Sequence, residues 1–192
     1  EDEFISYKGQ KTENGNTWEY DGLGIYKDKK DRKNYIGSFQ LNKRYGFGIM
    51  KEYENNSDEL KSFYQGIWKN DMKDGFGYFE SYYRFDDKVY IDYYLGSFKK
   101  DEKFGYGIMV DSSTVNCGLF INGKIVEGFR YEKDEEIIYK GYFNEDTFCF
   151  GEVYYLKENE VYYGQVELRN KHGYGYLKKK NKIKKCGGWD SD

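Results

Sequence analysis

The chain has 192 residues, and its 31 Lys and Arg against 34 Asp and Glu give a formal net charge of −3. This slightly acidic balance argues against a general nucleic-acid binder, which needs a basic surface. Charged residues make up 34% of the chain, which would favour disorder, but 21% of the residues are aromatic and disordered segments are poor in aromatics. We therefore expect a folded chain that does not bind nucleic acid.

One spacing of aromatic residues and glycines recurs along the chain. Its clearest copy is residues 64–79, where Tyr-x-Gly-x-Trp is followed, nine residues after the first Gly, by Gly-aromatic-Gly. The same skeleton stands one unit earlier and one unit later, and weaker copies extend it in both directions. In chain order the units cover residues 7–26, 35–50, 64–79, 94–109, 116–129, 139–154 and 162–177, with a partial unit at 185–192.

A fixed period of this length is typical of stacked-repeat architectures. We therefore interpret residues 1–192 as a single array of about seven and a half units. The sequence does not begin with Met and stops partway through a unit. We expect it to be a piece of a longer protein.

The full skeleton resembles the MORN (membrane occupation and recognition nexus) repeat, which combines Tyr-x-Gly-x-Trp/Phe, an Asn-Gly-Lys-like turn and Gly-x-Gly. The chain departs from this pattern by extra residues between the early units and by eroded fifth and sixth units. The resemblance implies a scaffold at cytoskeletal or membrane-associated assemblies. Because such arrays are joined to lipid-kinase and methyltransferase domains in some proteins, it also implies, as an alternative, the regulatory part of a larger enzyme.

Apolar residues alternate within each unit and glycines interrupt it, which favours strands over helix. A two-residue turn at Asp71-Met72 would make a hairpin in which Trp68 faces Gly75 and Tyr64 faces Phe79. The predicted fold is all-β, an elongated single-layer antiparallel sheet of stacked β-hairpins (a MORN-repeat solenoid), twisted into a groove. We assign the longer inter-unit segments to charged loops along one edge; they are Lys27–Asn34, Glu54–Ser62 and Glu80–Asp92.

The residues for most enzyme and metal sites are missing from the sequence. It holds one histidine, His172, which we place in a turn, and its three cysteines have no paired spacing. The Gly-aromatic-Gly triplets lack the third glycine and the following helix of a phosphate-binding loop. We predict a protein that is not an enzyme, with no catalytic residue, cofactor or metal, in the reducing environment of the cytoplasm.

Two features remain as candidate sites, and the first is the aromatic face of the predicted sheet. These rings could simply form the core, but a single-layer sheet leaves one apolar face for a partner. We predict a groove that binds a helical or extended segment of another protein. Its residues are Tyr35, Phe39, Tyr64, Trp68, Tyr94, Phe98, Tyr139, Phe143 and Tyr162.

The second feature is a lysine cluster near the end of the sequence. Such a cluster can hold anionic lipid headgroups such as phosphoinositides, or it can protect an exposed sheet edge from stray pairing. Its members are Lys178, Lys179, Lys180, Lys182, Lys184 and Lys185. We also expect a homodimer through the terminal repeats, around Gly187 and Trp189, because the end strands of an open sheet invite pairing.

Overall fold

The computed structural model describes residues 5–180 and 182–189, and none of these residues is helical. The chain divides into two compact units after Glu102. The first unit holds β1 (Ile5–Asn14), β2 (Thr17–Asp28), β3 (Lys33–Gln40), β4 (Lys43–Tyr53), β5 (Leu60–Lys69), β6 (Met72–Phe85) and β7 (Lys88–Lys99). The second holds β8 (Glu102–Val110) from its second residue on, β9 (Thr114–Ile121), β10 (Lys124–Glu132), β11 (Ile137–Asn144), β12 (Thr147–Tyr155), β13 (Glu160–Glu167), β14 (Asn170–Lys179) and β15 (Lys182–Trp189).

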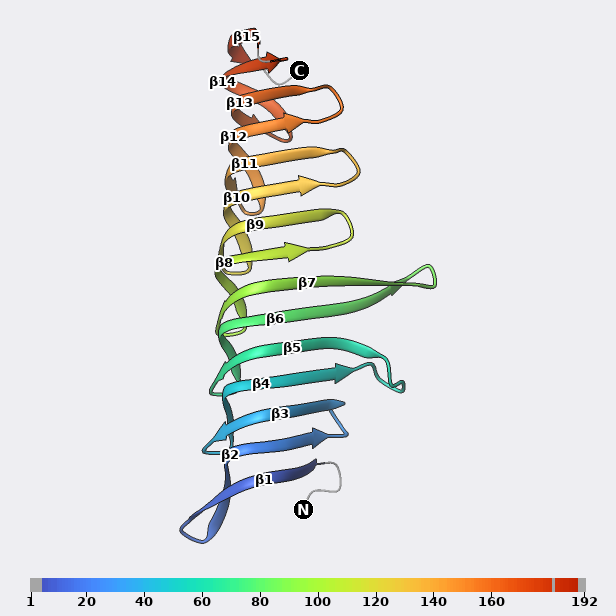
Figure 1. Ribbon diagram of the computed structural model, residues 1–192, viewed down its shortest axis with the longest axis vertical. Coiled ribbons are helices and arrows are strands. Elements are labelled where there is room, and N and C mark those ends of the chain that lie inside the picture. Colours follow the sequence, from blue (N-terminus) through green and yellow to red (C-terminus); the bar gives the residue numbers. More distant parts are fainter. Residues whose placement is uncertain (1–4, 181, 190–192) are drawn as a thin grey trace. The chain divides into compact units, whose positions relative to one another are not determined.

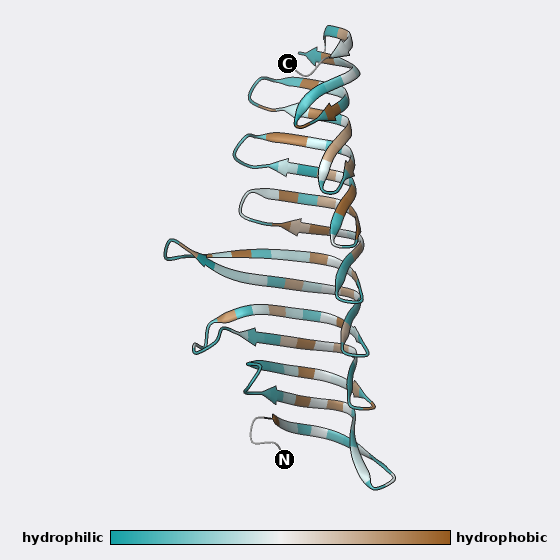
Figure 2. Cartoon of the chain, turned by 180° about the vertical axis from the view of Figure 1, so that it is seen from behind, coloured by the Kyte–Doolittle hydropathy of each residue, from teal (hydrophilic) through white to brown (hydrophobic). Residues whose placement is uncertain are grey.

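Within each unit, strands that follow one another in the sequence lie side by side and run antiparallel (Figure 1). This confirms the predicted all-β architecture of consecutive hairpins. Hydrophobic and hydrophilic positions alternate along the strands (Figure 2), as expected when successive side chains point to opposite faces. In the part of the chain that the structure describes, no helix has the length and apolarity needed to cross a membrane.

The turn of the β5–β6 hairpin lies one residue earlier than predicted. Asn70 and Asp71 both have positive φ, at 51° and 67°, which is the backbone of a type I′ hairpin turn. Tyr64 faces Phe79 as predicted, but Trp68 faces Lys73, so the predicted pairing of Trp68 with Gly75 is wrong. Asn and Asp tolerate this left-handed backbone better than Met does, which moves the turn away from Asp71-Met72.

A bulge between the turn and the facing glycines changes the strand register, so the earlier turn and the pairing of Tyr64 with Phe79 occur in one hairpin. The register shifts between Gly66 and Trp68, so Ile67 stands outside the regular ladder. The Tyr64 hydroxyl donates a hydrogen bond of 3.0 Å to the Ile67 carbonyl, which supplies that carbonyl with a partner. The same bond joins a Tyr to the carbonyl three residues later in four other hairpins, from Tyr7, Tyr35, Tyr94 and Tyr162.

In the β5–β6 hairpin the Tyr64 ring lies over a pair of facing glycines. Gly66 faces Gly77 across the ladder, and a Cβ placed on Gly77 would come within 2.6 Å of the Tyr64 ring. Glycine is therefore needed to leave room for the ring. The glycine pairs beneath Tyr7, Tyr35 and Tyr162 have the same relation to their rings.

One predicted loop is strand instead. Residues Glu80–Asp92 continue β6 to Phe85 and begin β7 at Lys88, so that the loop end of this hairpin projects beyond its neighbours in the first unit (Figure 1). The two strands pair in unbroken register up to Phe85 and Lys88. Aromatic and β-branched residues on both strands favour this extension. Residues 54–59 form a loop as predicted, whereas the segment 27–34 contributes only a short turn between β2 and β3.

Candidate functional site

The predicted groove residues form the core of the sheet. Their exposed fractions lie between 0% and 6% for Tyr35, Phe39, Tyr64, Trp68, Tyr94, Phe98, Tyr139 and Phe143, and at 0% for Tyr162. In the first unit they pack edge to face, with ring centroids 5.0 Å apart for Tyr64 and Trp68 and 5.3 Å apart for Tyr64 and Phe98. These rings therefore give the sheet its stability, and little of their own surface is left for a partner.

Above the rings of the first unit lies an open hollow, which we call the ring trough. It consists of two cavities of about 480 and 490 Å³ that share Lys33, Arg44, Met50 and Asp71. Its floor is formed by Tyr26, Phe39, Met50, Tyr64, Trp68 and Phe79. Its two sides come from opposite ends of the strands: the hairpin turns supply Asp71 and Asp101, and the loop ends supply Glu52 and Ser81.

Cations cover part of the floor of the ring trough. The Arg44 guanidinium lies 4.3 Å from the Trp68 ring centroid, and the Lys73 ammonium lies 4.3 Å from that of Phe79. Such cation–π contacts hold charged groups against an apolar surface. Lys33 forms an ion pair of 3.5 Å with Glu52 at the loop side. The trough thus presents the half-buried rings of Tyr26 and Phe79, bordered by charges of both signs.

The turn side of the trough is fixed by a residue that the sequence analysis missed. Asp71, the second residue of its turn, accepts hydrogen bonds of 2.9 Å from the backbone N–H and from Nε of Arg44 in the preceding hairpin. Its own N–H donates to the Arg44 carbonyl. Asn42, Asp101 and Asp146 accept a backbone N–H of the preceding hairpin in the same way. Asn or Asp at the second turn position was a signal that could have been found.

In the second unit, the β13–β14 hairpin carries an arginine, Arg169, at the second position of its turn. Arg169 forms ion pairs of 2.7 Å with Glu132 and 3.3 Å with Glu135, at the loop end of β10. In a flat sheet a turn residue and a loop end are separated by a whole strand, and the eight residues of β13 would span roughly 26 Å. The contact therefore requires a strongly curled sheet. We call this contact the Arg169 bridge, because it crosses the ring face from one edge to the other.

The Arg169 bridge includes a shielded carboxylate. The Glu132 side chain is 13% exposed, and burial raises the pKa of its carboxyl, while the charge of Arg169 opposes part of that rise. Lys171, on the turn side, reaches the Tyr155 ring at the loop end of β12, 4.6 Å from its centroid. Turn-side cations therefore occupy the ring face here.

The fifth repeat has an asparagine where the six other complete repeats have the Tyr of Tyr-x-Gly. Asn116 is 1% exposed. Its side-chain amide donates a hydrogen bond of 3.0 Å to the Thr114 hydroxyl and accepts one of 2.7 Å from Nε of Arg130. The Arg130 guanidinium also covers the Phe143 ring at 5.0 Å. A polar pair thus fills the space of the missing ring, with its hydrogen bonds satisfied.

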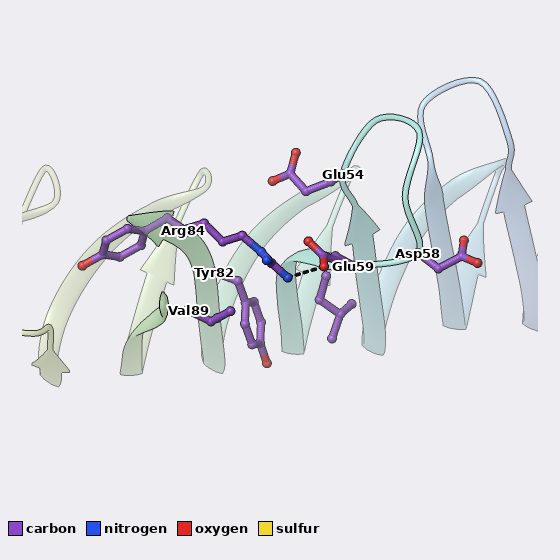
Figure 3. Close-up of a pocket in the computed structure, with 8 residues that line it drawn as sticks. Glu54, Asp58, Glu59, Tyr82, Arg84 and Val89 are labelled. Carbon is purple, nitrogen blue, oxygen red and sulfur yellow. Dashed lines mark hydrogen bonds and ion pairs between the residues drawn. The ribbon is translucent and has the colours of Figure 1, made fainter. Parts of the chain in front are cut away.

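A third cavity, of about 470 Å³, lies between the 54–59 loop and the projecting end of the β6–β7 hairpin (Figure 3). Leu60, Tyr82 and Val89 line it together with an ion pair between Arg84 and Glu59. The sequence analysis missed it because that end was expected to be a loop. We call it the arm pocket.

The predicted lysine cluster lies on β14 and β15, except for Lys180, which follows β14 in the turn; residue 181 is outside the described residues. Lys179 and Lys184 pair with Glu160 at 3.2 and 3.0 Å, while Lys178 and Lys185 lie over the rings of Tyr176 and Trp189. Contacts within the chain therefore engage four of the six lysines. Lipid binding by the cluster stays a prediction, as does a dimer through the terminal repeats.

His172 lies in β14 rather than in a turn, and its Nε2 is 3.4 Å from a Glu167 carboxylate oxygen. Over the two described ranges, no group of three or more His, Cys, Asp or Glu residues could hold a metal ion.

Comparison with known proteins finds a similarity to a MORN-repeat protein. Over 56 residues the chain is 36% identical to MORN repeat-containing protein 3 of Xenopus laevis, covering 29% of this chain and 24% of that protein. The match thus spans about a quarter of the relative's length. No family model matches the chain.

Proposed function

Because the chain fits the MORN-repeat family in both sequence and fold, we propose that it is a non-catalytic scaffold whose ring trough receives a segment of a partner protein. The likeness to a MORN-repeat protein indicates a protein-interaction or membrane-associated repeat protein, and the family is generally non-enzymatic. The partner binds in the ring trough, and the scaffold works at a cytoskeletal or membrane-associated assembly.

The continuous hollow of the ring trough carries this proposal. An apolar floor between two charged sides suits an amphipathic helix, whose stripe at i, i+3, i+4 and i+7 would face Met50 and Phe79. The flanks of that helix would meet Lys33 and Lys61 on one side and Asp71 on the other. Because the rings are already packed, the partner adds to a formed surface and completes no missing core.

The same burial determines which residues can test the proposal. Trp68 and Phe98 are 3% and 5% exposed, so replacing them by Ala would remove core contacts and lower stability. Their loss would not distinguish a binding role from a structural one. Residues at the edge of the trough are the better choice.

A photo-crosslinking amino acid placed on β5 tests the ring trough. At Lys61, which a register shift between Leu60 and Ser62 leaves outside the regular ladder, it lines the trough. At Lys69, also exposed and on the same strand, alternation from Trp68 puts it on the opposite face. We expect partner peptides to be crosslinked from position 61 and not from 69. A synthetic copy of the crosslinked peptide should become helical on binding and lose affinity with Lys61→Glu but not with Lys69→Glu. Crosslinks from position 69 alone, or equal loss with both variants, would refute the ring trough as the site.

A further inference from the structure

The projecting end of the β6–β7 hairpin, residues 82–91, has features that the ring trough does not use; we call it the arm. The rings of Tyr83 and Tyr90 stack across the arm at 5.5 Å, but Phe85, Val89 and Ile91 are 70%, 53% and 47% exposed. A two-stranded ribbon is marginally stable by itself in water. An arm with this much exposed apolar surface is typical of a docking element.

The arm also presents an open strand edge. Within the described residues, the pairing of β6 with β5 ends at Ser81, while β6 continues to Phe85 beside β7 alone. The turn residues Asp86 and Asp87 both have positive φ, so Phe85 and Lys88 are the hydrogen-bonded pair that closes a two-residue hairpin. Hydrogen bonding alternates along an antiparallel pair. The backbone N–H and C=O groups of Tyr82 and Arg84 therefore point away from β7, toward the open edge.

The arm pocket lies directly beside this edge. Its apolar surface comes from Leu60, Tyr82 and Val89, and it is closed on one side by the Arg84–Glu59 ion pair, whose side chains point toward each other in Figure 3. Tyr82 lies three residues beyond Phe79, so alternation places it on the face opposite the rings. Tyr82 and Glu54 also contribute to the ring trough, so the two hollows meet at the loop end of the sheet.

The charge around the arm pocket indicates what would bind there. Glu54, Asp58 and Glu59 stand on its loop side, against Arg84 on the arm. Asp58 forms an ion pair of 3.0 Å with Arg32, but its side chain is fully exposed, and Glu54 is exposed as well. Acidic groups at the mouth of an apolar pocket favour a ligand with basic residues beside an apolar one.

We propose that the arm binds an extended segment of another protein as an added strand on the open edge of β6. Backbone hydrogen bonds to Tyr82 and Arg84 would hold the segment, as in other cases of β-strand addition. Because alternate side chains of a strand share a face, one large apolar side chain enters the arm pocket while the Lys or Arg residues two positions before and after it face Glu54 and Asp58. This site adjoins the ring trough but does not depend on a helix binding there.

The test uses the whole chain and a synthetic peptide, acetyl-Thr-Lys-Thr-Phe-Thr-Lys-Thr, which puts Lys, Phe and Lys on one face of a strand. The pair Val89→Asp and Ile91→Asp provides the matched control, because both residues are exposed on β7 and only Val89 lines the pocket. We expect Val89→Asp to weaken peptide binding by about tenfold or more and Ile91→Asp by less than about twofold. Equal effects of the two variants, or no saturable binding to the unaltered chain, would overturn the proposal.

Two further measurements separate strand addition from other contacts. Glu54→Lys should weaken binding of the peptide that carries two Lys residues. The same substitution should strengthen binding of a peptide in which Glu replaces both Lys residues. Two further peptides carry N-methyl groups on alternate backbone nitrogens, one at the odd-numbered residues and one at the even-numbered residues. Methylation should abolish binding of one peptide and leave binding of the other, because only alternate N–H groups face the edge of β6. Indifference to methylation in both peptides would refute strand addition. A dimer of the chain without peptide that Val89→Asp dissociates would overturn the proposal in favour of a second copy as the occupant.

Discussion

Hairpin β5–β6 in the first unit and hairpin β11–β12 in the second both carry a pair of facing glycines, but the two pairs are needed for different reasons. A Cβ on Gly77 would meet the Tyr64 ring, which lies over the pair. In the second hairpin, Gly141 and Gly151 have φ values of 150° and 141°, and a Cβ on either would meet a backbone carbonyl of the facing strand. One pair makes room for a ring, and the other allows two backbones to approach closely.

The two hairpins also differ in the group that donates a hydrogen bond to the carbonyl at the bulge. In β5–β6 the Ile67 carbonyl accepts the Tyr64 hydroxyl at 3.0 Å. In β11–β12 the equivalent carbonyl, that of Tyr142, accepts the Cys149 thiol at 3.2 Å, while Tyr139 packs against Phe148 with ring centroids 5.0 Å apart. The same repeat spacing therefore supports two local structures, distinguished by the position of one Tyr ring.

The largest expected effect comes from removing the ring that lies over the glycines. Tyr64→Ala should lower the free energy of unfolding of the first unit by about 3–5 kcal/mol, because a fully buried aromatic residue is lost. Tyr45→Ala, at an exposed position of the same unit, should change it by less than about 0.5 kcal/mol. Urea unfolding followed by circular dichroism measures both. Similar losses for the two variants would contradict the core role of Tyr64.

Filling the glycine position beneath the ring should have the next largest effect. Gly77→Ala is expected to cost about 1–3 kcal/mol, the usual range for overpacking, because the Tyr64 ring must shift. Gly188 is the matched control, because a Cβ there would have open space around it. Gly188→Ala should therefore change stability by less than about 0.5 kcal/mol in the same unfolding experiment.

Removing only the hydroxyl sharpens the comparison of the two bulges. Tyr64→Phe keeps the ring but leaves the Ile67 carbonyl without its partner, which should cost about 1 kcal/mol. Tyr139→Phe should cost less, because in that hairpin Cys149 supplies the donor. Cys149→Ala is the complementary variant. If Tyr139→Phe costs as much as Tyr64→Phe, the assignment of the two donors is wrong.

The smallest expected change in stability concerns the Arg169 bridge. Arg169→Ala should cost less than about 1 kcal/mol, because the guanidinium is largely exposed. The substitution should have a clearer effect on the carboxyl of Glu132. Burial already raises the pKa of this carboxyl above its ordinary value of 4.5. Without Arg169 that pKa should rise further, which NMR titration of the carboxyl carbon would show.

The sign of the pH dependence follows from the direction of that shift. Because the folded-state pKa of Glu132 lies above the unfolded value, its contribution to stability is fully present below the unfolded pKa and is lost as pH rises through the folded one. In Arg169→Ala this loss should extend to higher pH than in the unaltered chain. If the pH range over which this stability is lost were the same in both chains, Arg169 would not act on Glu132.

The sequence was sufficient to predict the hairpins, the pairing of Tyr64 with Phe79 and the faces of the rings, because these follow from alternation and from a six-position repeat. It did not predict the Arg169 bridge, because the curl of the sheet that joins a turn to a distant loop end leaves no local pattern. The arm escapes a sequence-based prediction because charged residues such as Asp86 and Asp87 are typical of a loop, whereas here they form only its turn. The burial of the rings could be established only from the structure, and partner binding along the face that they form stays a prediction.

The most direct test of the ring-over-glycine packing is a double-mutant cycle between Tyr64 and Gly77, with Tyr139 and Gly151 as the comparison. Gly77→Ala should cost at least about 1 kcal/mol less when Tyr64 is already Ala, because the added methyl group then occupies the space the ring has left. The Tyr139 and Gly151 variants should be additive within about 0.5 kcal/mol, since Gly151 is limited by backbone. An equal cost of Gly77→Ala with and without the Tyr64 ring would contradict the account.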